Sequence, residues 1–377
     1  MKWVKRIAIG LGVLMVLAVG FVVVFFYALH PKSRAAPTVT APTTPEAIAR
    51  GEYLAKHVAG CVVCHSPIDE KAPGDPWDEG KVFAGRVFPT GGSFPGKLIG
   101  PNITSAAVGK WTDGELLRAI REGVDRDGKT LFPMMPYGRF NKLTDEDTLS
   151  IIAYMRSVPA QSTMVGKTQV DFPVSMFVRL APKPLSAPPP AWPADPVARG
   201  KILLEVMSCI DCHTPMEKGK PIESKLFAGG NKFSSPELGT VYTSNITSDT
   251  ATGIGAYSDD DLMRVFREGK GKDGRTLWVM PWKATQGTKE EDLRALIAAL
   301  RTLKPIANVV PAPKILISVP PSAPVAPAAG SGSADVSAVG SASAAGSGSA
   351  AGSGSATAVA SGPAAAAGSG SAAAPAK

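Results

Sequence analysis

Two five-residue motifs hold all four cysteines of this 377-residue chain, and each has the form C-x-x-C-H. On a helical turn, residues three apart lie on one face, so both sulfurs of a motif can reach one flat partner while the adjacent imidazole ligates a metal ion. Two thioether bonds to a haem and one axial bond to its iron use all three residues, and C-x-x-C-H is the attachment signal of c-type haem. The sequence therefore predicts two covalently bound haem c groups. Their attachment residues are Cys61 and Cys64 with His65 as iron ligand, and Cys209 and Cys212 with His213 as iron ligand.

Three other uses of these cysteines fit the sequence less well. Two disulfides would leave the repeated histidine without a role. A zinc site would need a further ligand, and the chain has only two other histidines, His30 at the end of an apolar segment and His57. We expect His57 to be a solvated surface residue. A thioredoxin-like C-x-x-C would need a βαβ context, which the sequence does not show.

A methionine from the later part of each half is the expected second axial ligand, on the opposite face of the haem. Met280 is the last methionine of the chain and the natural candidate in the second half. In the first half, an ungapped alignment pairs Met134 with Met280, whereas the shared order Met-Pro-aromatic pairs Met135 with it. We favour Met135, because Pro136 stiffens the loop that presents the thioether, and Met134 is the alternative.

Ligation by His and Met closes both axial positions of a haem and raises its reduction potential. Oxygen or peroxide chemistry would need an open position on the iron. We therefore expect an electron-transfer protein, or the non-catalytic subunit of an oxidoreductase complex, with no catalytic residues of its own.

The two motifs belong to a longer internal repeat. Ala-Arg-Gly, Phe-Ala-Gly, Asn-Ile-Thr-Ser, Arg-Glu-Gly and Asp-Gly-(Lys or Arg)-Thr-Leu occur in both halves, in the same order around C-x-x-C-H. The repeat predicts two domains of usual size, over residues 46–160 and 194–305. Strand signals are weak between these motifs, so both domains are expected to be mainly helical.

Helix starts can be placed from capping residues. Thr44-Pro45 and Asp195-Pro196 are typical of an N-cap followed by proline at the first helical position. Thr112 and Glu115 form a capping box before a helix that ends at Gly123.

The second copy predicts matching elements. A helix begins at Ser258 and ends at Gly269. The last helix of each copy begins at Thr144 and at Thr288, where Glu291 is expected to complete another capping box.

An apolar segment at the start of the chain predicts a membrane anchor. Residues 7–29 carry no charge and follow Lys2, Lys5 and Arg6. The stretch is long enough to cross a hydrocarbon core of about 30 Å and longer than the apolar core of a signal peptide. Basic residues favour the cytoplasmic side. We therefore expect a single-pass protein of the inner membrane with its haem domains on the periplasmic side.

The remaining segments lie between or after the domains. Residues 1–30 are the anchor, 31–45 a Pro/Thr/Ala tether and 161–193 an extended Pro-rich connector. Residues 306–377, rich in Ala, Gly, Ser and Pro, cannot bury enough apolar surface to fold and are expected to be a disordered tail.

The formal charge of +8 is not evidence of a nucleic-acid partner. Acidic and basic residues are nearly balanced within 46–160 and within 194–305, so the excess lies in the flanking segments. No basic surface for nucleic acid is therefore expected on the domains.

With these motifs in place, the chain resembles the cytochrome subunits of bacterial membrane-bound alcohol and gluconate dehydrogenases, within the class I cytochrome c superfamily. The resemblance covers residues 46–305. Besides C-x-x-C-H, it rests on the repeated Asn-Ile-Thr and Arg-Glu-Gly, on Met135-Pro136-Tyr137, and on Phe172-Pro173 with Arg179 in the connector. It implies a mainly α fold with two tandem class I cytochrome c domains after the transmembrane helix. His65 and His213 would be the proximal ligands, and Met135 and Met280 the distal ones.

The implied role is transfer of electrons between a periplasmic dehydrogenase or the quinone pool and a downstream acceptor. The partner would be that dehydrogenase or an oxidase. Those dehydrogenase subunits typically carry three haem domains, whereas this chain has two motifs. An alternative is a cytochrome subunit of a respiratory oxidase. A dihaem peroxidase or thiosulfate-oxidising enzyme fits less well, because each copy has its own Met-Pro signal.

Overall fold

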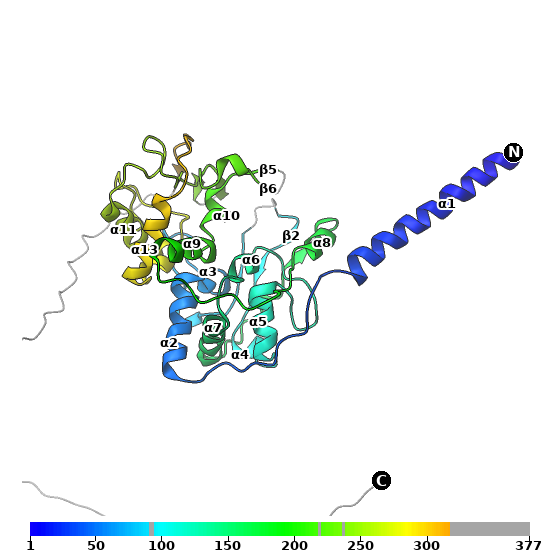
Figure 1. Ribbon diagram of the computed structural model, residues 1–377, viewed down its shortest axis with the longest axis horizontal. Coiled ribbons are helices and arrows are strands. Elements are labelled where there is room, and N and C mark those ends of the chain that lie inside the picture. The colour runs from blue at the N-terminus through cyan, green and yellow to red at the C-terminus, as the bar shows by residue number, and fades with distance from the viewer. Residues whose placement is uncertain (90–93, 218–219, 236–237, 317–377) are drawn as a thin grey trace, which may run out of the picture. The chain divides into compact units, whose positions relative to one another are not determined.

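Helices dominate the computed structural model, which describes residues 1–89, 94–217, 220–235 and 238–316. The mainly α prediction is confirmed. The long apolar helix α1 (Lys2–Val23) continues through the π-helical turn η1 (Val24–Ala28). Figure 1 shows α1 at the amino-terminal end of the chain, followed by the helices of the first and then the second copy of the repeat.

The first copy contains short strands between its helices. Its elements are α2 (Pro45–Tyr53), η2 (Leu54–Val58), α3 (Cys61–His65), η3 (Glu79–Lys81), β1 (Arg86–Val87), β2 (Gly96–Lys97), β3 (Ile99–Gly100), α4 (Ser105–Val108), α5 (Asp113–Glu122), α6 (Tyr137–Phe140) and α7 (Asp145–Ser157). The connector adds β4 (Gln169–Val170), α8 (Val174–Phe177) and η4 (Val178–Leu180).

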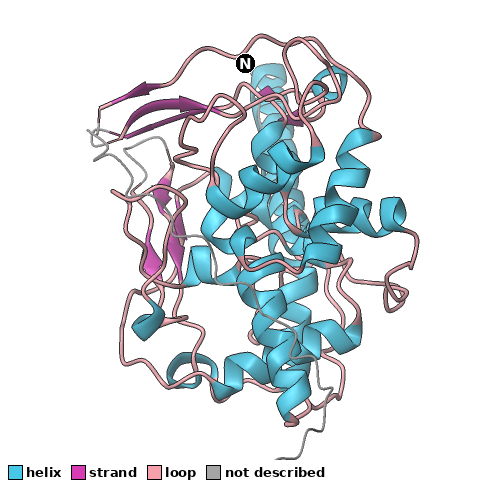
Figure 2. Ribbon diagram, turned by 90° about the vertical axis from the view of Figure 1, so that its left-hand side faces the viewer, coloured by secondary structure: helices cyan, strands magenta, loops and turns pink. Residues whose placement is uncertain are grey.

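The second copy repeats the order of the longer helices, with different short elements between them. Its elements are α9 (Pro196–Val206), α10 (Cys209–His213), β5 (Met216–Glu217), β6 (Lys220–Pro221), η5 (Glu223–Lys225), β7 (Lys232–Ser235), β8 (Gly239–Tyr242), α11 (Asp259–Glu268), α12 (Trp282–Gln286), α13 (Glu290–Arg301) and β9 (Lys314–Ile315). All strand pairs are antiparallel: β1 with β3, β2 with β4, β5 with β6, and β8 with both β7 and β9. In Figure 2 most of the strands lie along one side of the helices.

Most predicted helix starts are confirmed. Thr44 and Asp195 cap α2 and α9 through their side chains, each with proline at the first position. Capping boxes begin α5 at Thr112 and α11 at Ser258. Each of these two helices ends at a glycine in the left-handed region, Gly123 (φ 74°) in the case of α5, where a side chain on any other residue would be strained.

The repeated Ala-Arg-Gly builds the same helix pair in both copies. A Cβ at Gly51 would lie 1.8 Å from the Ser150 carbonyl oxygen, so glycine lets α2 approach α7 closely. Gly200 plays the same part between α9 and α13. The preceding arginine bonds a carboxylate on the partner helix: Arg50 bonds Asp147 at 2.9 Å, and Arg199 bonds Asp292 at 2.6 Å.

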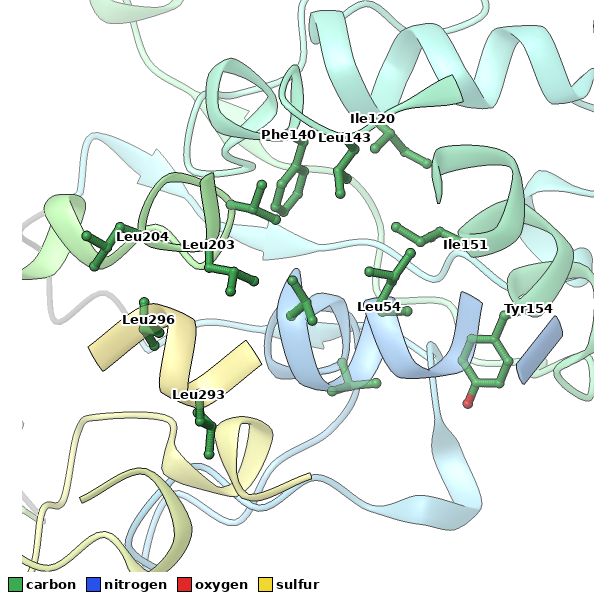
Figure 3. Close-up of a cluster of buried hydrophobic side chains, with 14 of the residues drawn as sticks. Leu54, Ile120, Phe140, Leu143, Ile151, Tyr154, Leu203, Leu204, Leu293 and Leu296 are labelled. Atoms are coloured by element: carbon green, nitrogen blue, oxygen red, sulfur yellow. The ribbon is translucent and has the colours of Figure 1, made fainter. Parts of the chain in front are cut away.

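The two copies pack on each other reciprocally. Helix α12 of the second copy contacts η2 of the first, and α6 of the first, the counterpart of α12, contacts α9 of the second. The buried apolar side chains form one cluster that includes residues of both copies. Figure 3 shows side chains from the two copies facing one another, among them Phe140 and Leu203.

We call the interface between the two copies the joint. Polar contacts at the joint show that two predictions are wrong. His57 is not a solvated surface residue: it is half-buried and its Nδ1 lies 2.8 Å from the Ala284 carbonyl oxygen of the other copy. Thr288 does not cap α13, which begins after Lys289 without a side-chain cap. The Thr288 hydroxyl instead donates to the His57 carbonyl oxygen at 2.7 Å. Contact between the copies has replaced the local cap.

The chain after each last helix also departs from prediction. In the first copy, Gln161 and Thr163 accept bonds from Asn102, and Thr168 bonds Ile99. The predicted connector therefore packs along the first copy from its first residue.

The chain that follows the second copy packs along that copy in the same way. Ile306 accepts from Asn245 at 2.7 Å, Asn308 bonds Thr252, and β9 pairs with β8. The prediction of disorder from residue 306 is therefore wrong for 306–316, because backbone groups of this segment bond the folded copy. Residues 317–377 of the predicted tail lie outside the described residues.

The predicted tether is also bonded to the first copy. Arg34 donates to Oε1 of the buried Glu122 carboxylate from Nη2 at 2.7 Å and from Nε at 2.9 Å. Further along, the Ala41 amide donates to Asp113 at 2.8 Å. Residues 34–41 thus lie along α5 as a bound strap.

Tyr53 supports the joint through a buried charge, and its loss should weaken the whole fold. Its hydroxyl donates to Asp292 at 2.5 Å, and Asp292 is fully buried. We expect Tyr53→Phe to lower the free energy of unfolding by about 1.5–3 kcal/mol, the range for a hydrogen bond to a charged group. Denaturant unfolding of the haem-loaded chain in detergent would measure this.

Tyr242→Phe is the matched control, because among the described residues the Tyr242 hydroxyl has no protein partner. It should leave the unfolding midpoint nearly unchanged. Equal effects of the two substitutions would show that the bond to Asp292 does not stabilise the joint.

Candidate haem sites

Both C-x-x-C-H motifs form a single helical turn that begins after a left-handed residue. Gly60 (φ 61°) precedes α3, and Ser208 (φ 56°) precedes α10. This conformation turns the chain sharply out of the preceding helix. No disulfide joins any of the four cysteines. The expectation that each motif presents its cysteines from one helical turn is therefore met in both copies.

The imidazole of each motif is oriented by a backbone carbonyl. His65 Nδ1 lies 2.8 Å from the Pro101 oxygen, and His213 Nδ1 lies 2.7 Å from the Ser244 oxygen. Burial lowers the pKa of both histidines, so they are neutral at pH 7. With Nδ1 donating to a carbonyl, Nε2 is left as the atom that can bind a metal ion.

The repeated asparagine holds the loop that carries this carbonyl. Asn102 follows Pro101 and is buried; its Oδ1 accepts from the Thr104 amide and hydroxyl, and its Nδ2 donates to Gln161 and Thr163. Asn245 makes the matching bonds to Thr247 and Ile306 in the second copy. Asn-Ile-Thr also matches the acceptor sequence for N-linked glycosylation. A buried amide whose hydrogen bonds are all made cannot accept a sugar, so this sequence serves a structural role.

The methionine loops of the two copies match at Met135 and Met280. The Tyr137 amide donates to the Met135 carbonyl and the Trp282 amide to the Met280 carbonyl, both at 2.8 Å. Each aromatic ring covers the glycine that ends α5 or α11. Met135 packs against the apolar cluster, whereas Met134 is 53% exposed. Both line the cavity described below.

One continuous cavity of about 1340 Å³ is lined by both motifs and by both methionine loops. All four cysteines, both motif histidines, Met135 and Met280 contribute to its wall. Apolar side chains such as Ile99, Leu131 and Leu277 supply much of the rest. The structure therefore brings together every site residue that the sequence predicted, in two equivalent sets.

The chemistry of the donors fits haem better than a thiolate metal site. Burial raises the pKa of Cys61 and Cys209 to about 12 and of Cys212 to about 11. Metal ligation and thiol exchange both use the thiolate. Among the described residues, however, no group of three or more His, Cys, Asp or Glu side chains could hold a metal ion. An apolar cavity with sulfur and imidazole on its wall instead suits a flat, apolar macrocycle.

A contact between the two sites was missed by sequence reasoning. Arg139, four residues after Met135, bonds Glu205 at 2.7 Å and Asp211 at 2.9 Å. Asp211 lies between the two cysteines of the second motif. The methionine loop of one site is thus tied to the attachment turn of the other. In the sequence, the only indication of this contact was Asp211, the acidic residue inside the second C-x-x-C-H.

A second missed residue is Asp75, which acts electrostatically on both sites. Burial raises the pKa of Asp75 to about 6, Arg86 opposes this and Glu70 adds to it. Burial raises the pKa of Cys64 and Cys212, and the charge of Asp75 raises both further. The carboxylate is therefore near the attachment turns of both copies. No motif contains Asp75, so only the fold reveals this position.

Comparison with known proteins agrees with this geometry. Residues 48–159 match the family model described as Cytochrome c. The chain is 31% identical over 288 residues to the fructose dehydrogenase cytochrome subunit of Gluconobacter japonicus, covering 72% of this chain and 56% of the relative. It is 27% identical over 304 residues to the cytochrome c subunit of the quinone alcohol dehydrogenase of Gluconobacter oxydans (strain 621H), covering 76% and 59%.

A third relative is named as a dihaem protein. The diheme cytochrome c-type protein of Cereibacter sphaeroides is 28% identical over 206 residues, covering 52% of this chain and 66% of the relative. The chain spans a little under three fifths of the two dehydrogenase subunits. The resemblance to dehydrogenase cytochrome subunits is thus confirmed. The first copy is a cytochrome c domain, the type of domain that binds haem c covalently.

Asp75 should make the haem potentials depend on pH. Above pH 6 it is deprotonated, and a negative charge near a haem bound at these turns would favour its more positive oxidised state. The midpoint potentials should therefore fall as pH rises from 5 to 7. Asp75→Asn should remove this slope and leave the potentials higher at pH 7.

Potentiometric titration at several pH values would check this. The exposed carboxylate of Asp260, on α11, supplies the control: Asp260→Asn should keep the wild-type slope. A slope that survives in Asp75→Asn would assign the titration to another group.

Proposed function

We propose that this chain is a membrane-anchored dihaem c-type cytochrome. It would transfer electrons between a periplasmic dehydrogenase, or the quinone pool, and a downstream acceptor. The observation that carries the proposal is the pair of equivalent donor sets, each with two cysteines and one histidine on one turn and a methionine elsewhere on the wall of the same cavity. The chain carries no substrate chemistry of its own in this proposal.

The residues of each site would have separate tasks. Cys61 and Cys64 would attach the first haem and His65 Nε2 would bind its iron, with Met135 as the second axial ligand. Cys209, Cys212, His213 and Met280 would do the same in the second copy. When bound, haem with His and Met ligands supplies one-electron redox chemistry at a raised potential. The carbonyls of Pro101 and Ser244 fix the imidazoles in one tautomer.

The joint between the copies supports exchange of electrons between the two haems. Both donor sets line one cavity. The joint is also held from both ends, by Arg139 with Asp211 and by His57 with Ala284. Fixed geometry keeps the reorganisation that accompanies electron transfer small. Two haems held at fixed positions in this way would provide a short electron-transfer path through the protein.

The names of the relatives support a dehydrogenase as partner. Two of them are cytochrome subunits of dehydrogenases, and we propose the same association for this chain.

The long apolar helix supports attachment to the inner membrane. Lys2–Ala28 is a 27-residue helix that contains an 18-residue window with a mean hydropathy of 2.9. It is long enough to span a bilayer, although a signal sequence passes the same test. The basic residues before it would stay in the cytoplasm and place both sites in the periplasm.

Haem stoichiometry tests the two-site proposal. The purified wild-type chain should give two haem c per chain by pyridine haemochrome and by mass, and should titrate as two one-electron centres. Replacing both Cys209 and Cys212 by alanine should leave one haem per chain. The matched double variant at Cys61 and Cys64 should leave the other. One haem per chain in the wild-type protein would refute the proposal for one of the copies.

The methionine assignment can be tested by ligand binding to the reduced protein. With both axial positions closed, carbon monoxide should leave the wild-type spectrum unchanged. Met135→Ala and Met280→Ala should each open one site and allow carbon monoxide to bind, because the thioether is lost. Met134→Ala is the control and should behave like the wild type. Binding in Met134→Ala alone would reverse the choice, and rapid peroxide turnover by the wild type would favour an enzyme.

A further inference from the structure

The connector is bonded to the carboxyl-terminal end of the apolar helix. The Arg179 guanidinium donates from Nε to the Phe26 carbonyl oxygen at 2.6 Å and from a terminal nitrogen to the His30 carbonyl oxygen at 2.7 Å. It also lies over the Tyr27 ring, 4.9 Å from its centroid. Carbonyls at the end of a helix lack partners within the helix, and a cation is favourable there. Arg179 therefore joins the connector to the end of α1–η1.

Aromatic packing accompanies these bonds. The rings of Phe26 and Phe177 meet edge to face with centroids 5.6 Å apart. Figure 1 shows α8, which contains Phe177, near the end of α1. The last turn of the apolar helix and the connector thus form one aromatic and aliphatic surface.

Much of this surface is exposed. We define the connector patch as Phe172, Phe177 and Leu180, which are 76%, 54% and 38% exposed. Residues 172–193 contain Arg179 and Lys183 but no acidic residue. Contiguous exposed apolar side chains mark an interaction surface. Asp171 directly precedes the patch, and Arg179 and Lys183 outnumber it, so residues 171–193 carry a small positive net charge, which suits a negatively charged partner surface.

The length of the apolar helix places the connector patch at a defined depth relative to the bilayer. The uncharged stretch 7–29 spans about 35 Å at 1.5 Å per residue, whereas a hydrocarbon core is about 30 Å thick. In a spanning helix the last aromatic residues, including Phe26 and Tyr27, therefore reach the boundary between acyl chains and headgroups. Phe177 contacts Phe26, so it lies at that same boundary.

We propose that the connector patch inserts into the headgroup region of the bilayer that α1 spans, as a second membrane contact. This inference rests on the membrane anchoring in the proposed function. Aromatic residues favour that region, and short apolar surfaces bind it more strongly next to anionic lipids. Arg179 would fix the patch to the helix end, and Lys183 would face the lipid phosphates.

A second contact would orient the first haem site toward the membrane. Val170, two residues before the patch, and Val178, between Phe177 and Leu180, line the cavity. The Arg34–Glu122 pair holds the tether to the same copy. With both the tether and the connector bonded close to the helix end, the first copy would keep one face toward the lipid. The first site would then be the one that exchanges electrons with a partner at the membrane surface.

Photo-crosslinking of the full chain tests this. The residue p-benzoylphenylalanine would replace Phe177 or Phe172, in haem-loaded protein reconstituted into vesicles of phosphatidylethanolamine and phosphatidylglycerol. Leu17, within α1, is the positive control, and Val309, which is 84% exposed in the second copy, is the negative control. Lipid adducts on the protein would be measured by mass spectrometry after illumination.

Positions 172 and 177 should give lipid adducts about tenfold above position 309, as expected for side chains in the headgroup region. Arg179→Ala should lower the yield at 177 and leave the yield at 17 unchanged. Adducts at 17 but only background at 172 and 177, or crosslinks between two protein chains at 177, would overturn the inference and leave the anchor in place. Background at position 17 as well would refute the anchor and the inference together.

Discussion

A buried carboxylate controls how the two copies are assembled. Asp292 is fully buried on α13 and is bonded by Arg199 from its own copy and by Tyr53 from the other. A carboxylate without partners in such a place is very unfavourable. Separating the copies would remove one of its two partners, so this residue favours the closed joint. The shared cavity and the tie between Arg139 and Asp211 both depend on that joint.

Equivalent elements of the two copies meet at the joint, but the side chains that bond across it are different. In the repeat, Tyr53 corresponds to Ile202 and Arg139 to Ala284. The first copy contributes His57, Tyr53 and Arg139, which bond carboxylates and a carbonyl of the second copy. In the opposite direction, Thr288 of the second copy donates to the His57 carbonyl oxygen. This difference gives the duplicated halves one defined pairing, because two identical first copies would offer Arg139 no carboxylate: Lys56 and Val63 stand where the second copy has Glu205 and Asp211.

The electrostatics around the two sites differ in the same way. Asp211 lies within the second motif, whereas Val63 occupies that position in the first. Asp75 belongs to the first copy and acts on both attachment turns, whereas Arg86 acts on the first turn. The two sets of predicted ligands therefore have different surroundings, which would give haems bound there two different potentials. A potential difference would give the direction of electron flow between them.

The sequence alone determined the local chemistry and most of the local structure. C-x-x-C-H is complete within five residues, and caps such as Thr112 with Glu115 act over a single turn, so neither needs knowledge of the fold. Only the tertiary structure decided where the copies meet, because Thr288, His57 and Asp75 are bonded or buried by residues far away in the chain. It also extended both copies past residues 160 and 305, since Asn102 and Asn245 bond backbone that carries no motif. Short-range patterns determine turns and ligands, whereas burial and long-range hydrogen bonds depend on the packed whole.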